Sequence, residues 1–356
     1  MTTDPRHPWR RLLRNRSAVC GMLVIAVCCF IAVFAYFIGV DGSPDANRII
    51  VEIGGQKPGF RQQFLKLPRQ VPAGRQSFID ILLHGRLERF DFIPVTGFAW
   101  KGDSLIASKY VDEGVTERIA FSRTGHPGME VSDMRFVLGT DRFGRDILSR
   151  LLVGSRVSLG VGLVTVLLSV GIGVLLGAVA GYFRGRTDDA IMWLINVVWS
   201  IPTLLLVFAV TLVLGKGFWQ VFVAIGLTTW VNVARLIRGQ VLGVSRLEYI
   251  DAARVLGYSH ARIILRHILP NVSGPVIVIA ASNFATAIVI EAGLSFLGVG
   301  VQPPQPSWGL MIKENYNFII THNPMLALAP GFAIMALVLA FNLLGNGLRD
   351  ALQVRE

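Results

Sequence analysis

The chain of 356 residues is 53% hydrophobic and only 16% charged, and its formal net charge is +11. Soluble domains carry roughly 25% charged residues, and a soluble protein of this length can bury one long apolar helix but not six. The composition therefore excludes an ordinary soluble protein and indicates a multi-pass membrane protein. The basic residues lie beside apolar segments, which argues against a nucleic-acid-binding protein.

Six segments reach the roughly 18–20 apolar residues that cross a hydrocarbon core. They lie at about residues 17–40, 157–183, 190–214, 217–236, 272–297 and 325–348. The first exceeds the ~7–15 apolar residues of a signal peptide and no A-x-A-like site follows it, so we expect an uncleaved anchor. The three cysteines, Cys20, Cys28 and Cys29, all fall in this anchor. None of them can form a disulfide in the exterior loop, and no metal-ligand spacing is present.

Arginines cluster before the first segment and after the fourth, which places both regions in the cytoplasm by the positive-inside rule. These residues are Arg6, Arg10, Arg11, Arg14 and Arg16, and then Arg235, Arg238, Arg246, Arg254, Arg262 and Arg266. We therefore predict an all-α membrane protein with about six transmembrane helices and both termini in the cytoplasm. The predicted parts are a cytoplasmic tail and anchor at 1–40, an exterior (periplasmic) insertion at 41–150, and a transmembrane core at 151–350 with a cytoplasmic loop at 240–270.

The insertion between the first two spans lacks any long apolar run. A plain connector is rarely longer than about 15 residues, so we expect a small exterior subdomain with short strands. It ends with a segment, 146–156, that can form an amphipathic helix.

Within the spans, small residues and prolines predict local geometry. Gly173, Gly177 and Gly181 have the four-residue spacing that lets helix backbones pack closely in lipid, although general glycine richness is the alternative. Pro202 lacks a backbone donor and predicts a kink in the third span. We interpret Trp308, in a proline-rich outer loop, as an interfacial anchor.

The cytoplasmic loop carries the most informative pattern. Residues 246–256 favour a helix in which Ala252 and Ala253 offer a small flat patch. Gly257 can end it in a left-handed cap, and Ser259 can cap a second short helix before Pro270. Two short helices with a small-residue face suit docking into a groove on another protein.

This stretch resembles the EAA loop of bacterial ABC importer permeases. The sequence keeps its spacing in Asp251-Ala252-Ala253, Gly257 and His267-Ile268-Leu269-Pro270, with Asp in place of the usual Glu and His267 in place of Ile. The form Arg-His-Ile-Leu-Pro-Asn is similar to the dipeptide, oligopeptide and nickel branch. The same branch is indicated by segments 138–146, 180–182, 294–298 and 306–309. The resemblance covers residues 138–350 and, loosely, the anchor, but not residues 41–137.

The resemblance implies the permease subunit of an ATP-driven importer in the bacterial inner membrane, forming half of the translocation pathway. Such a subunit pairs with a second permease, normally a different chain, above two ATP-binding subunits, and an exterior binding protein delivers the substrate. The resemblance assigns coupling to the ATPase to Glu248, Asp251, Ala252, Ala253 and Gly257. The alternative for the two acids is that they are ordinary first-turn charges favoured by the helix dipole.

We do not expect the chain to be an enzyme. Gly215-Lys216 lacks the earlier glycine and the following hydroxyl of a phosphate-binding loop, and we interpret His267 as structural. ATP and Mg are therefore expected in partner subunits, with no cofactor, metal or catalytic residue in this chain. Its other expected partner is membrane lipid.

Polar side chains at membrane depth are costly and tend to face a bundle interior or a water-filled path. The candidates for the translocation pathway are Asn196, Asn232, Asn283 and Glu291. Structural hydrogen bonds between helices are the alternative.

Two other classes remain open. An ion-coupled secondary transporter would explain Glu291 but commonly shows paired repeats with broken helices, and it leaves the 251–270 pattern unexplained. A membrane-anchored enzyme would need the exterior His84 and His126, which have no site-forming spacing. Family frequency favours di/oligopeptides as the substrate, with nickel complexes, opines and oligosaccharides as alternatives.

Overall fold

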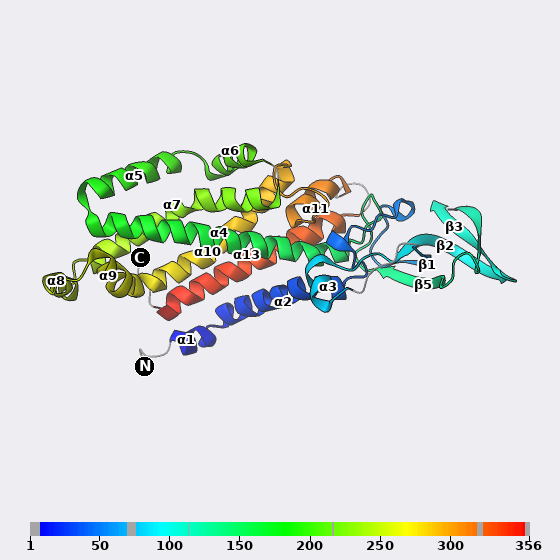
Figure 1. Ribbon diagram of the computed structural model, residues 1–356, viewed down its shortest axis with the longest axis horizontal. Coiled ribbons are helices and arrows are strands. Elements are labelled where there is room, and N and C mark those ends of the chain that lie inside the picture. Colours follow the sequence, from blue (N-terminus) through cyan, green and yellow to red (C-terminus); the bar gives the residue numbers. More distant parts are fainter. Residues whose placement is uncertain (1–7, 70–75, 113, 216, 319–322, 353–356) are drawn as a thin grey trace. The chain divides into compact units, whose positions relative to one another are not determined.

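The computed structural model describes residues 8–69, 76–112, 114–215, 217–318 and 323–352 (Figure 1). The chain divides into two compact units. The first comprises Met1–Cys28, Ser158–Gln302 and Ala333–Glu356, and the second comprises Cys29–Val157 and Pro303–Phe332.

Five helical segments of the described chain are long and apolar enough to cross a membrane, and a bent pair can form a sixth span. The single spans are α2 (Arg16–Ile38), α4 (Ile147–Phe183), α7 (Phe218–Val244), the segment His260–Leu297 that ends in α10 (Leu269–Leu297), and α13 (Met325–Leu352). The bent pair is α5 (Gly185–Trp199) and α6 (Thr203–Leu214). The prediction of a helical protein with about six spans is confirmed.

Two spans begin well before the predicted residue, and the fourth ends at Val244 rather than 236. The segment 146–156 is not a separate amphipathic helix, because α4 runs without a break for 37 residues from Ile147. The fifth span likewise begins at His260 rather than 272. In both cases the first turns of the helix contain polar residues. A prediction based on the length of the apolar run therefore starts the span too late.

The third span is broken rather than kinked. α5 and α6 meet at a 90° bend, and Pro202 is the N-cap of α6. Proline lacks the amide hydrogen of a helix interior and its ring clashes with the carbonyl four residues earlier. The carbonyl of Pro202 then accepts from the amide of Leu206 at 3.0 Å, which starts the new helix.

The glycines of α4 lie against the backbone of α7, as their spacing predicts. A Cβ built on Gly173 would lie 2.5 Å from Cβ of Val233, and one on Gly177 would lie 2.5 Å from the carbonyl oxygen of Ala234. Gly181 meets the carbonyl oxygen of Arg238 at 2.8 Å in the same way. These three glycines therefore let the two helices pack at backbone distance.

Short elements precede and follow these spans. In the first unit, α1 (Pro8–Arg14), α8 (Glu248–Val255), α9 (His260–Ile263) and the π turn η3 (Ile264–Ile268) flank the long helices. Leu12, Ala18 and Ala351 form a small buried cluster between the N-terminal helices and α13.

The second unit contains a five-stranded antiparallel sheet in the order β4-β3-β2-β1-β5 (Figure 1). The strands are β1 (Phe60–Pro68), β2 (Phe90–Lys101), β3 (Ser104–Asp112), β4 (Val115–Ser122) and β5 (Glu130–Phe136). Leu65, Val95 and Leu105 are buried on one face of the sheet, and Phe64 packs with Ile53 on the other. The predicted strands are present, and several are longer than expected.

The remaining elements of the second unit are helical. They are η1 (Pro44–Ala46), η2 (Val51–Ile53), α3 (Phe78–His84) and α11 (Trp308–Asn315). Trp308 is only 3% exposed, and its indole nitrogen donates to the carbonyl of Leu151 at 2.9 Å. The interpretation of Trp308 as an interfacial anchor is therefore wrong, because Gly154 leaves room for the ring against α4.

A buried ionic network joins α11 to the start of α4. Glu314 accepts from Arg145 at 2.9 Å and from Arg150 at 3.2 Å. Arg145 also pairs with Asp141 at 2.6 Å. Removing one member would leave a buried charge without compensation, which is strongly destabilising.

The close packing of α4 on α7 can be tested with one methyl group. Gly177→Ala places its Cβ against a backbone oxygen that cannot rotate away, and overpacking of this kind costs about 1–3 kcal/mol. We expect a lower unfolding temperature for the detergent-purified protein, measured by differential scanning fluorimetry. Gly171→Ala is the matched control, because a Cβ there meets nothing within 4 Å. Equal unfolding temperatures for the two variants would contradict the packing described.

Candidate functional site: the coupling segment

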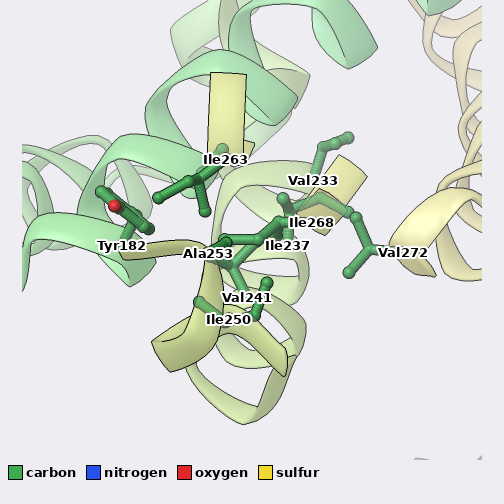
Figure 2. Close-up of a cluster of buried hydrophobic side chains, with 10 residues drawn as sticks. Tyr182, Val233, Ile237, Val241, Ile250, Ala253, Ile263, Ile268 and Val272 are labelled. Carbon is green, nitrogen blue, oxygen red and sulfur yellow. The ribbon is translucent and has the colours of Figure 1, made fainter. Parts of the chain in front are cut away.

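The candidate site is the segment 247–271, which contains α8, α9 and η3 and connects α7 to α10. α8 begins after Leu247 and turns two side chains inward: Ile250 is fully buried and Ala253 is 5% exposed. Figure 2 shows both in one cluster with side chains from α7. The segment therefore has a packed inner face.

This apolar cluster joins α8 to three long helices. Its other buried members come from α4, α7, the turns before α10, and α10 itself: Ala178, Tyr182, Val233, Ile237, Val241, Ile263, Ile268 and Val272. A cluster that draws side chains from so many elements resists separate movement of any one of them.

The end of α8 is a Schellman motif built on Gly257. The amide of Tyr258 donates to the carbonyl of Ala253 at 3.2 Å, and the amide of Gly257 donates to that of Arg254 at 3.0 Å. Gly257 has φ of +76°, a conformation that glycine adopts without steric cost. The predicted left-handed cap is confirmed.

The second short helix is not a separate element. Ser259 caps α9 as predicted, accepting from the amide of Arg262 at 3.4 Å, but α9 continues through η3 into α10. The amide of Leu269 reaches back five residues to the carbonyl of Ile264. Pro270 follows directly, and its missing amide hydrogen explains why the regular ladder is interrupted here.

Polar and aromatic contacts fasten both ends of the segment. The hydroxyl of Tyr182 lies 2.9 Å from Nδ1 of His260, and Asn271 donates to the hydroxyl of Tyr249 at 3.1 Å. His267 stacks on Tyr258 with ring centroids 5.8 Å apart. This contact is consistent with a structural role for His267.

The predicted coupling residues do not all face the same way. Glu248, Asp251, Ala252 and Gly257 are exposed, whereas Ala253 faces the core. The interpretation of the two alanines as one flat contact patch is therefore wrong for Ala253, because adjacent helical residues point about 100° apart. Asp251 pairs with Arg254 at 2.7 Å on the surface, which leaves both the coupling and the helix-dipole interpretations of the acids open.

Two residues of the outer face were missed by the sequence prediction. Val255 is 88% exposed and Leu256 is 70% exposed, directly before the glycine cap. The signal in the sequence is a pair of apolar residues at the end of a short polar helix, directly before a glycine. At this position no apolar neighbour can cover them.

The four polar candidates in the spans separate into two groups. Asn196 and Asn232 are exposed on this chain, and Asn196 accepts from Arg235 at 2.9 Å. Asn283 is buried and donates to Ser169 at 3.2 Å, while the buried Glu291 accepts from Ser295 at 2.6 Å. Asn283 thus makes the interhelical hydrogen bond of the alternative interpretation.

An ion pair that was not anticipated from the sequence connects α5 to α7. Arg238 donates to both carboxylate oxygens of Asp188, at 2.5 and 2.6 Å. The neighbouring Arg235 lies 3.5 Å from the ring centroid of Trp199. Arginines predicted only as cytoplasmic charges therefore also hold the first arm of the broken span.

Within the described part of the chain, no group of three or more His, Cys, Asp or Glu side chains is placed to hold a metal ion. Of the two exterior histidines, His84 pairs with Asp80 at 3.0 Å and His126 packs against the ring of Phe121.

The apolar spans, with the folded segment that connects two of them, define a multi-span membrane protein. Residues 173–355, just over half of the chain, match the model of the family described as binding-protein-dependent transport system inner membrane component. The chain belongs to this family. Residues 6–48 also match the model of the N-terminal transmembrane domain of oligopeptide transport permease C.

Several permeases of known name are similar to this chain. The glutathione transport system permease protein GsiD of Pectobacterium atrosepticum is 43% identical over 215 residues, covering 60% of this chain and 71% of that protein. The oligopeptide permease OppC of Bacillus subtilis is 40% identical over 214 residues, with 60% and 70% covered. The di/tripeptide permease DppC of Pseudomonas aeruginosa is 41% identical over 224 residues, with 63% and 74% covered.

Among solved structures, a chain of the inward-facing MetNI methionine ABC transporter is similar, with a TM-score of 0.48 and 18% identity. The match covers 58% of this chain and 96% of that chain.

Family membership makes the chain a permease of the inner membrane and a component of a binding-protein-dependent ABC importer. It is a membrane component rather than an enzyme. The resemblance on residues 251–270 is thereby confirmed, and the ion-coupled transporter and the membrane-anchored enzyme are excluded as classes.

The glycine cap of α8 makes a specific prediction about strain. Gly257→Val forces a β-branched residue into the left-handed region, at a cost of about 1–3 kcal/mol, whereas Gly257→Asn is better tolerated there. We expect faster hydrogen exchange in 248–258 for the valine variant than for the asparagine variant. Gly243→Ala is the control, since that helical position is also open within 4 Å but has no positive φ. The capping role is wrong if the three variants exchange alike.

Proposed function

We propose that the chain is the permease of a di/oligopeptide importer and forms half of its translocation pathway. The permeases similar to it carry names for oligopeptide, dipeptide, di/tripeptide and glutathione transport, and this agreement supports a peptide substrate. Nickel complexes remain the alternative within the branch. In the proposed orientation, both termini and the segment 247–271 are cytoplasmic.

The proposed assembly contains a second permease chain, two ATP-binding subunits beneath the cytoplasmic segment, and an exterior substrate-binding protein. ATP and Mg bind the ATP-binding subunits, which carry out the hydrolysis. This chain supplies the path through the membrane and the surface on which the ATPase acts.

One observation carries the coupling mechanism. The outward face of α8 has exposed apolar side chains, whereas its opposite face is packed against the spans. Val255, Leu256 and Ala252 form the outward surface, with Glu248 and Asp251 beside it. Ile250 and Ala253 hold the opposite face in the cluster with α4, α7 and α10. A groove on the ATP-binding subunit that takes up the outer residues therefore moves the long helices with α8.

Coupling also needs a difference in free energy between two states of the permease. ATP binding shifts the spans only if the closed ATPase dimer holds α8 in a position that one arrangement of the spans prefers. The packed inner face supplies this preference, because it transmits a displacement instead of absorbing it.

The docking surface is tested by placing a charge on it. Val255→Asp buries a carboxylate in the proposed interface, and we expect substrate-stimulated ATPase activity of the reconstituted complex to fall at least about tenfold, because a buried unpaired charge is costly. Val115→Asp is the matched control, because Val115 is 54% exposed on β4. Wild-type activity in the Val255 variant, with the subunits still bound, would overturn the proposed surface.

Substrate class is tested by transport itself. We expect proteoliposomes that contain the full importer to accumulate labelled di- or tripeptides in an ATP-dependent manner, with the binding protein supplied on the exterior side. Competition by unlabelled peptides and none by chelated nickel is the expected pattern. Uptake of nickel complexes without peptide uptake would replace the substrate assignment and leave the permease assignment intact.

A further inference from the structure

The short helix α3 exposes apolar side chains that the permease function does not explain. Phe78 is 60% exposed, Ile79 is 64% exposed and Leu83 is 54% exposed, and no residue of α3 is buried. Phe78 and Leu82, and Ile79 and Leu83, are four residues apart and therefore share one face of the helix. A soluble loop helix would gain nothing from such a face in water.

The opposite face of α3 is polar. Asp80 and His84 form a pair at 3.0 Å there, and both side chains are exposed. Asp80 and His84 are the only polar residues of α3, so a broad apolar surface faces away from a narrow polar one. An apolar face opposite a polar one is typical of a helix that lies in the plane of a membrane interface.

Contacts place α3 at the level where the first span ends. The ring of Phe78 lies 5.3 Å from that of Phe37, one residue before the last residue of α2. Arg156 of α4 donates to the carbonyls of Leu82 and Leu83, at 2.6 and 3.3 Å, and its guanidinium lies 5.0 Å from the ring of Tyr36. Figure 1 shows α3 beside this end of α2.

The apolar surface of the span continues onto α3 without a gap. Phe30, Phe34, Phe37 and Phe78 form a chain of neighbouring rings, with centroid distances of 4.8, 6.5 and 5.3 Å. Phe30 and Ile38 are exposed on α2 in the way expected of lipid-facing residues.

Arg86, just after α3, marks the polar boundary of the same level. Its guanidinium lies 5.3 Å from the ring centroid of Phe37, and Arg86 is exposed. A cation held over the last aromatic ring of a span is placed to meet lipid phosphates, as basic side chains at helix ends do.

We propose that α3 is a membrane-interface anchor whose apolar face, Phe78, Ile79, Leu82 and Leu83, inserts into the leaflet that contains the C-terminal end of α2. In the proposed orientation this is the outer leaflet. The partner is the lipid surface. The anchor, together with Arg156, fixes the base of the insertion to the membrane plane through α2 and the start of α4.

The test measures depth in the bilayer at single positions of the assembled importer in nanodiscs. Cys20, Cys28 and Cys29 are replaced by serine, and a nitroxide is attached to Ile79→Cys or Leu83→Cys. We expect collisions with dissolved oxygen to exceed those with a water-soluble nickel chelate several-fold at both positions. At His84→Cys, on the polar face of the same helix, and at Val115→Cys in the sheet, collisions with the nickel chelate should exceed those with oxygen.

Two outcomes would overturn the proposal. Equal access of the nickel chelate to Ile79, Leu83 and His84 would show a helix in water. Protection of Ile79 and Leu83 from both reagents would show a face covered by another subunit. Neither outcome bears on peptide transport, because the measurement reports depth and is independent of substrate and of which leaflet is involved.

Discussion

The structure of the first unit depends on the apolar contact between α8 and the helices behind it. Complete burial of a side chain such as Ile250 stabilises by about 1.5–3 kcal/mol, and Val233, Ile237 and Val241 of α7 are fully buried in the same cluster. A connection that makes such contacts is part of the core and not a loose loop. The proposed coupling of α8 to the spans rests on this contact.

The chemistry around this contact keeps the segment in one conformation. The glycine at the end of α8 allows the chain to reverse, the serine starts the next helix, and the turn before Pro270 is widened because proline offers no amide. Each of these devices satisfies backbone groups that would otherwise lose their partners near a membrane, where an unsatisfied group is expensive. The segment from α8 to α10 is therefore held by capped helix ends together with the packed side chains of the cluster.

Much of this could be predicted from the sequence because the signals are local. Apolar length predicts the spans, a glycine followed by a serine predicts the two caps, and glycines four apart predict that α4 packs closely on another helix. The orientation of neighbouring residues could not be predicted in the same way: Ala252 and Ala253 look equivalent in the sequence, yet only the second is covered, by side chains distant along the chain. The same holds for Trp308, whose burial depends on space left by Gly154.

Polar residues in the spans show most clearly what cannot be predicted from the sequence. Membrane depth alone makes Glu291 a candidate for the translocation pathway, but its carboxylate accepts from Ser295, and the hydroxyl of Ser295 accepts from the amide of Val301 at 3.1 Å. A Cβ on Gly300 would collide with Ser295, so the chain after α10 folds tightly back onto this group. Glu291 thus helps to hold the turn that ends the fifth span, and a role in the path would have to be compatible with that turn. Each of these hydrogen bonds stabilises more when it is buried, because no water is available to replace it. The contacts that close the helix therefore offset part of the cost of a polar residue at this depth.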